Sequence, residues 1–183
     1  MRQNPELRRT DPEAGISLLE VMVAVAVILL GFLALGQTIV TTHALKRTSE
    51  ERRTVLSALR VVGEELRVMA EDAAASDPDT WAQTIVDDLT SATRLGTMFS
   101  VRGLTPQVGH TTVGEIRVVT SELTTDADLG VEIGMPRDLD GDGDVNNSNV
   151  VSTATMLPMV ITLRYRGLGG DRTIRRGFYV TRF

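Results

Sequence analysis

The feature that most constrains the fold is an uncharged stretch near the N-terminus. No residue from Val21 to Thr42 carries a charge, and most of them are aliphatic. As a helix with a rise of 1.5 Å per residue, this stretch would be about 33 Å long, enough to cross a bilayer core of about 30 Å. It therefore predicts a membrane-spanning helix at the start of the chain, with a separate domain formed by the residues after it.

Residues 1–15 form a polar leader that includes Arg2, Arg8 and Arg9. Because positive flanks favour the cytoplasmic side, we expect a single pass through the inner membrane, with the N-terminus cytoplasmic and the headgroup periplasmic. An ordinary signal anchor would give the same pattern. A cleaved secretory signal would carry its small residue after the apolar stretch, whereas Gly15 precedes it here.

The junction between the polar and apolar segments reads GISLLE, from Gly15 to Glu20. A charge within a span costs about 2.5–3.5 kcal/mol on insertion scales, so Glu20 is a candidate functional residue. The junction resembles the prepilin signature of type IV pilins and type II secretion pseudopilins. In that signature a Gly precedes the cut, an apolar residue stands directly after it, and a Glu stands fifth in the mature chain. Ile16 replaces the usual Phe, and the resemblance extends to about Leu45.

This resemblance implies how the N-terminus is processed and used. A prepilin peptidase would cut after Gly15, and Ile16 would become N-methylated. Glu20 would then pair with the cationic amine of Ile16, in its own chain or in a neighbouring subunit, because a buried carboxylate needs a cation. The alternative is that Glu20 reaches the cytoplasmic interface of the membrane.

Beyond the span, residues 45–75 contain no proline and one glycine, Gly63. Apolar residues recur at spacings of four and three, which predicts one face of a continuing helix. These positions are Val55, Leu59, Val62, Leu66, Met69 and Ala73. We expect this stripe to pack on a sheet, with a coiled-coil seam as the alternative.

The remaining chain predicts a short helix and antiparallel strands. The helix is expected from about Asp79 to Arg94, capped by Ser76 or Asp77. Its expected buried face is Trp81, Ile85, Val86 and Leu89. Alternation predicts strands near 97–102 and 114–121 and a C-terminal hairpin that turns at GLGG. Its expected inward residues are Met159, Ile161, Leu163, Tyr165, Ile174, Phe178 and Val180.

An acidic loop, DLDGDGDVNNSN, runs from Asp138 to Asn149 with the spacing of a twelve-residue calcium loop. Asp138, Asp140 and Asp142 hold positions one, three and five, and Gly143 stands at position six, where the backbone turns sharply. The loop resembles the EF-hand-like loops of dockerin repeats.

The later positions of this loop complete the expected ligand set. Asp144 would offer its carbonyl at position seven, and Asn146 would act at position nine. Asn149 stands at position twelve, where a carboxylate is usual, so the loop departs from the pattern there. We expect Ca²⁺ to bind this loop, and a solvated acidic loop is the alternative.

Charge and motif content narrow the function classes. The net charge of −5 disfavours nucleic acid as a partner. The arginines of the C-terminal hairpin are therefore expected to contact acidic surfaces of neighbouring subunits. The two histidines, His43 and His110, lie far apart, there is no cysteine, and no nucleophile or phosphate-binding motif occurs. We do not expect an enzyme.

Together these features predict an α+β, type IV pilin-like protein in which a long N-terminal helix packs on an antiparallel sheet. The expected divisions are a leader at 1–15, the membrane and assembly half of the helix at 16–44, its amphipathic half at 45–75, and a headgroup at 76–183.

The expected function is that of a minor pilin, PilV-like, in filament assembly or initiation. The alternatives are a minor pseudopilin of type II secretion and, from another class, a membrane-anchored calcium-binding adhesion module. The expected partners are prepilin peptidase, the inner membrane, and other pilins or pseudopilins in a hetero-oligomeric filament. From the inner membrane the subunit would pass into a pilus or pseudopilus, with the cell surface as a further location.

Overall fold

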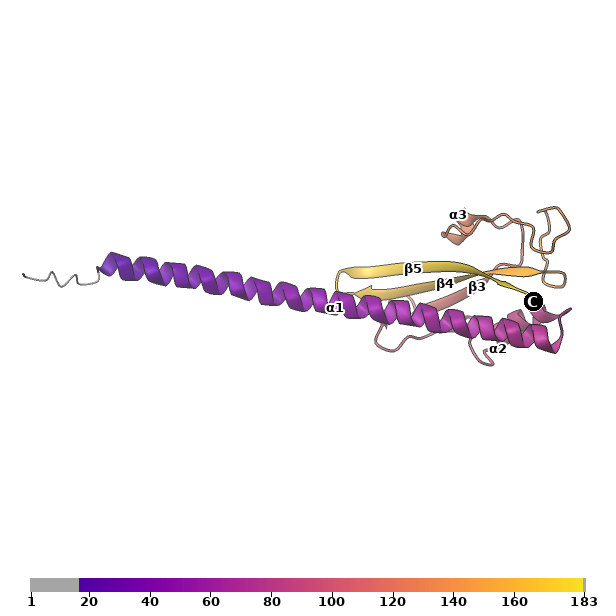
Figure 1. Ribbon diagram of the computed structural model, residues 1–183, viewed down its shortest axis with the longest axis horizontal. Helices are drawn as coiled ribbons and strands as arrows, with labels where there is room; N and C mark the ends of the chain where they lie inside the picture. Colours follow the sequence, from indigo (N-terminus) through magenta and orange to yellow (C-terminus); the bar gives the residue numbers. More distant parts are fainter. Residues whose placement is uncertain (1–16, 183) are drawn as a thin grey trace, which may run out of the picture. The chain divides into compact units, whose positions relative to one another are not determined.

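A computed structural model describes residues 17–182 (Figure 1). Its elements begin with a 59-residue helix, α1 (Leu18–Ser76). The chain divides into two compact units, one ending at Leu45 and the other beginning at Lys46. The helix α1 contributes to both units.

In the first unit, α1 begins at a cap that was not predicted from the sequence. The backbone N–H of Glu20 donates to the Ser17 hydroxyl, 3.2 Å away, as an N-cap serine allows. Glu20 thus lies in the first helical turn, where the helix dipole favours a negative charge. By length and composition, this helix can cross a membrane.

The threonines near the end of the apolar stretch turn their hydroxyls back onto the helix. Thr38, Thr41 and Thr42 donate to carbonyls one turn earlier, at 2.9, 3.0 and 2.7 Å. Each of these three hydroxyls therefore has a hydrogen-bond acceptor within the helix, as a hydrocarbon environment requires.

In the second unit, the predicted apolar stripe of α1 is confirmed. All six of its predicted residues are buried, together with Ala70. They belong to one hydrophobic core that also includes the inner residues of the sheet. The second unit therefore has a core of its own, and the chain has the α+β fold that the sequence predicts.

The sheet is antiparallel throughout. Its strands are β1 (Met98–Phe99), β2 (Thr105–Pro106), β3 (Gly114–Val118), β4 (Met156–Gly167) and β5 (Gly170–Thr181). β3 and β2 pair with one edge of β4, β5 pairs with the other, and β1 extends the sheet beyond β3. The predicted hairpin is confirmed as β4–β5, whereas the two earlier strands are shorter than predicted.

The short helix α2 (Trp81–Ser91) buries Trp81, Ile85 and Leu89, as predicted. The predicted cap is wrong, because α1 continues through Ser76 and Thr80 holds the N-cap position without a side-chain bond. Asp77 instead accepts from the Asp79 N–H at 3.0 Å and from the Thr80 hydroxyl at 2.9 Å. Its carboxylate stabilises the turn before α2.

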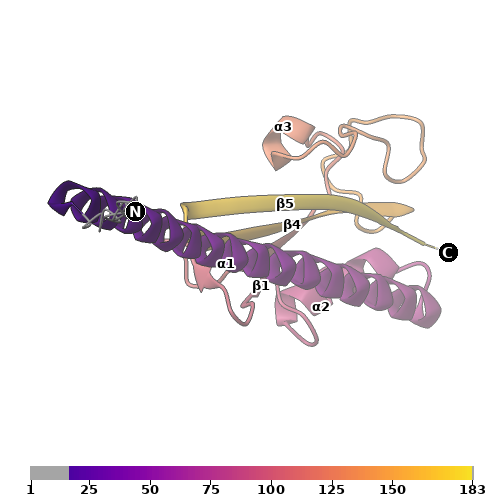
Figure 2. The same ribbon diagram turned by 60° about the vertical axis from the view of Figure 1, so that its left-hand side comes forward.

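Residues 119–155 form a segment with little regular structure, apart from α3 (Asp126–Leu129). Figures 1 and 2 show α3 and α1 on opposite sides of the β4–β5 hairpin. Leu139 and Val150 from this segment join the core. Residues 157–163 of β4 are consequently buried on both faces.

Candidate metal centre

The acidic loop folds around the carboxylate of Asp138. One carboxylate oxygen accepts from the Gly141 N–H at 2.6 Å, and the other accepts from the Gly143 N–H at 2.9 Å. Both glycines have a positive φ, +86° and +96°, which other residues rarely adopt. These backbone bonds, that from Gly141 foremost, lower the pKa of Asp138 and keep it ionised.

The next aspartates continue the winding of the loop. Asp142 accepts from the Asp144 N–H at 2.9 Å, and Asp144 accepts from the Asn146 N–H at 2.8 Å. Asp140, at position three, accepts from the Thr153 hydroxyl at 2.8 Å. The loop is therefore ordered by its own side chains.

A residue outside the loop completes the acidic cluster. Glu122 is fully buried, and its two oxygens accept from the Leu139 N–H at 2.6 Å and the Asn147 N–H at 3.3 Å. One carboxylate oxygen each from Glu122, Asp138 and Asp140 lies within 4.8 Å of the others. This group could hold a metal ion.

Of the residues expected as ligands from the sequence, Asp138 and Asp140 belong to this cluster of carboxylates. Asp142, Asp144 and Asn146 are exposed and lie outside the group of three carboxylates. Asn149, at position twelve, directs its side-chain oxygen to the Val151 N–H at 3.2 Å. Glu122 thus offers the carboxylate that position twelve lacks, and nothing in its local sequence, VVTSELTT, signals this role.

The donor set fits a hard cation such as Ca²⁺, which takes oxygen ligands. A fully buried carboxylate is costly unless it is hydrogen-bonded and its charge is compensated. Glu122 has backbone donors, but the charges nearest to it in the cluster are the like charges of Asp138 and Asp140. A bound cation would attract all three carboxylates and so outweigh the repulsion among them.

The segment after the loop is held by α2. The indole N–H of Trp81 donates to the Ala154 carbonyl oxygen at 2.8 Å in the buried interior. Ala154 lies between Thr153, which bonds Asp140, and Thr155, whose N–H donates to the Leu139 carbonyl at 2.9 Å. Trp81 therefore fixes the backbone of Ala154, whose neighbours Thr153 and Thr155 bond Asp140 and Leu139.

Of the predicted processing residues, Gly15 and Ile16 lie outside the described residues. Glu20 is described, in the first turn of α1, with its side chain exposed. No pairing of Glu20 with the Ile16 amine is therefore described.

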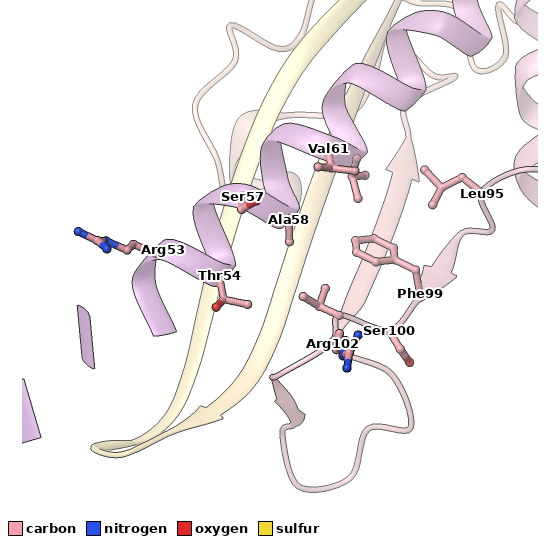
Figure 3. A pocket seen from close by; sticks show the side chains of 11 residues that line it. Arg53, Thr54, Ser57, Ala58, Val61, Leu95, Phe99, Ser100 and Arg102 are labelled. Carbon is pink, nitrogen blue, oxygen red and sulfur yellow. The ribbon is translucent and has the colours of Figure 1, made fainter. Parts of the chain in front are cut away.

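A surface groove lies beside the amphipathic half of α1. Figure 3 shows this groove, of about 610 Å³, with Leu95 and Phe99 facing Ala58 and Val61 of the helix. Its lining is mainly apolar, and its charged groups are Arg53 and Arg102. No acid–base pair converges here among residues 17–182, so the groove offers no catalytic constellation.

Comparison with protein-family models finds no family that matches this chain. Searches among curated proteins and among solved structures find no match either. The long apolar helix followed by an antiparallel sheet is consistent with a pilin-like fold.

Proposed function

We propose that this protein is a minor subunit of a type IV pilus-like filament, anchored in the inner membrane before assembly. The observation that carries the proposal is one continuous helix with two halves. Its first part is long and apolar enough for a membrane, and its second part packs on an antiparallel sheet. The GISLLE junction stands at the start of this helix, where a prepilin peptidase would cut.

Glu20 would guide assembly through its charge. Once residues 1–15 are removed, the amine of Ile16 is cationic. A bundle of apolar helices leaves little water around this amine or the Glu20 carboxylate. A carboxylate and an amine stabilise one another there, whereas either charge alone is expensive. Pairing between subunits would therefore fix how far one helix slides along the next.

The test joins processing to incorporation. Intact mass of the membrane-extracted protein is expected to show a chain that begins at N-methylated Ile16. Glu20→Ala is expected to insert and to be cut normally but to be depleted from sheared filaments. Glu50→Ala, an exposed carboxylate further along α1, serves as the control. An uncut N-terminus, or normal incorporation of Glu20→Ala, would contradict the proposal.

Two alternatives remain. A minor pseudopilin of type II secretion would share the same helix and processing, and loss of secretion rather than of surface pili in a deletion strain would identify it. A calcium-binding adhesion module anchored in the membrane would keep its N-terminus and never enter a filament. The first experiment separates that second alternative from the filament subunits.

We further propose that the acidic cluster binds one Ca²⁺. The support is the convergence of Glu122, Asp138 and Asp140, one of them fully buried. Outside the cell, a site with a dissociation constant of about 10⁻⁴–10⁻³ M would still be filled. At a free calcium concentration ten times that dissociation constant, binding would stabilise the folded state by about 1.4 kcal/mol.

The calcium test uses a fragment that begins at Lys46, since the core lies beyond that residue. Calcium is expected to raise the melting temperature relative to chelator, and Glu122→Gln is expected to abolish that increase. Glu132→Gln removes an exposed carboxylate of the same segment and should leave the increase intact. No calorimetric binding and an unchanged melting temperature at millimolar calcium would leave only a solvated acidic loop.

A further inference from the structure

β5 leaves one of its two edges without a partner strand. It pairs with β4 from Gly170 to Thr181, and no other strand between residues 17 and 182 pairs with it. Figure 2 shows β5 as the outermost strand of the sheet. At about 3.4 Å per residue, the unpaired edge is about 40 Å long. An edge of this kind is a template for another strand.

β5 lacks two of the usual devices that block an edge, a proline and a bulge, and its charged side chains restrict which strand can pair with it. The strand contains no proline, and its pairing with β4 runs one-to-one without a bulge. Residue Ile133 of the segment before the acidic loop packs on one face of β5, beside Gly177 and under the Tyr179 hydroxyl. That contact covers a face of the strand, and among the described residues no backbone bond reaches its outer edge.

The edge strand carries three arginines that form no ion pair with a described residue. Arg175 and Arg176 are exposed and Arg172 is half-buried. No described carboxylate lies within 4.0 Å of their guanidinium nitrogens. The other arginines of this region are paired: Arg164 with Glu115, Arg166 with Asp171, and Arg182 with Asp79.

The space beside this edge can receive side chains. Two cavities of about 360 and 270 Å³ lie between α1 and β5, and both are lined by Gly63 and Phe178. A Cβ atom on Gly63 would meet nothing within 4 Å, so the helix leaves room there. Alternate side chains of a strand added to β5 would enter these cavities, where Phe178 favours an apolar residue.

We propose that the free edge of β5 binds an extended, acidic segment of a different protein chain by strand addition. Main-chain hydrogen bonds would supply affinity, and carboxylates opposite Arg172, Arg175 and Arg176 would supply selectivity. A second copy of this chain is a poor occupant, because pairing two β5 strands would bring arginines against arginines. The proposal holds whether or not the chain enters a filament.

The test uses the full-length protein in detergent and a fluorescent peptide of alternating Glu and Val, followed by anisotropy. Saturable binding is expected. Arg175→Glu combined with Arg176→Glu should weaken it at least about ten-fold, because two attractions become repulsions. The control reverses two exposed arginines elsewhere, with Arg52→Glu and Arg102→Glu, and should change binding less than two-fold, a limit of about 0.4 kcal/mol.

A second peptide decides whether strand addition, rather than charge alone, is responsible. The same sequence with alternate backbone amides N-methylated cannot complete a strand ladder and should not bind the wild-type protein. This comparison needs no variant to fold. Equal binding of the methylated peptide, equal loss in both reversed proteins, or no binding of the unmethylated peptide at millimolar concentration would overturn the proposal.

Discussion

Trp81→Phe tests how α2 supports the acidic cluster. Trp81 is 1% exposed, and its indole N–H is 2.8 Å from the Ala154 carbonyl oxygen. Phe fills most of the same space but has no donor, so a buried carbonyl would lose its partner. Leaving such a group unsatisfied costs about 1–3 kcal/mol. The smaller ring adds about 1–2 kcal/mol in lost burial and residual cavity.

The expected loss is therefore about 2–5 kcal/mol, a large share of the 5–15 kcal/mol that stabilises a typical domain. With a urea dependence of about 2 kcal/mol per molar, the midpoint should fall by about 1–2.5 M. Far-ultraviolet circular dichroism of the fragment from Lys46 measures this, since Trp81 is the only tryptophan and its fluorescence is lost.

The same substitution should weaken calcium binding, because Ala154 is flanked by residues that bond Asp140 and Leu139. Leu163→Ala is the matched control. It removes a fully buried side chain of β4, opposite Gly114 and Ile174 in the sheet, at a comparable cost of about 2–5 kcal/mol. A loss below about 1 kcal/mol for Trp81→Phe would refute the estimate of its buried bond. Equal calcium affinity in the two variants would refute the link to the cluster.

Two further predictions concern the segment before the loop. The pKa of Asp126 lies below its ordinary value of 3.8 because the N–H groups of Met135 and Ile133 bond its carboxylate. Its stabilisation is thus present above about pH 4 and lost as the pH falls through the folded-state pKa. The protection of the amides of residues 133–135, measured relative to their intrinsic exchange rates, should fall below about pH 4, and Asp126→Asn, unlike the exposed Asp87→Asn, should show low protection already at pH 6. Gly177→Ala should destabilise the fold by about 1–3 kcal/mol in urea unfolding, because a Cβ there would lie 2.1 Å from Ile133 Cγ2. Ile133→Ala in the same chain should recover most of that loss, and strictly additive effects would contradict the clash.

Much of the fold was predictable because its signals are periodic. The apolar stripe of α1 repeats with the pitch of a helix, and the alternation in β4–β5 ends at a glycine-rich turn. The residues of the α1 stripe lie within three or four positions of one another in the sequence, so the pattern is local. Local sequence was sufficient to assign both the helix and the hairpin.

The parts that were missed depend on contacts between distant residues or on competition for one backbone group. Glu122 joins the acidic cluster only because the chain between β3 and β4 folds back on itself, and no local pattern marks such a return. Asp77 could cap a helix by its type, but the turn before α2 uses its carboxylate instead.

The inward-turned hydroxyls of Thr38, Thr41 and Thr42 have a consequence for any change of surroundings. These three hydroxyls already bond to the backbone of their own helix. Exchanging lipid for neighbouring helices would break none of these bonds and would need no new donor. The free energy of such a transfer would then depend on van der Waals packing along the span and on the carboxylate of Glu20 at its start. The apolar part of the helix is therefore suited both to lipid and to a bundle of neighbouring helices, and Glu20 is the residue whose energy would differ between the two.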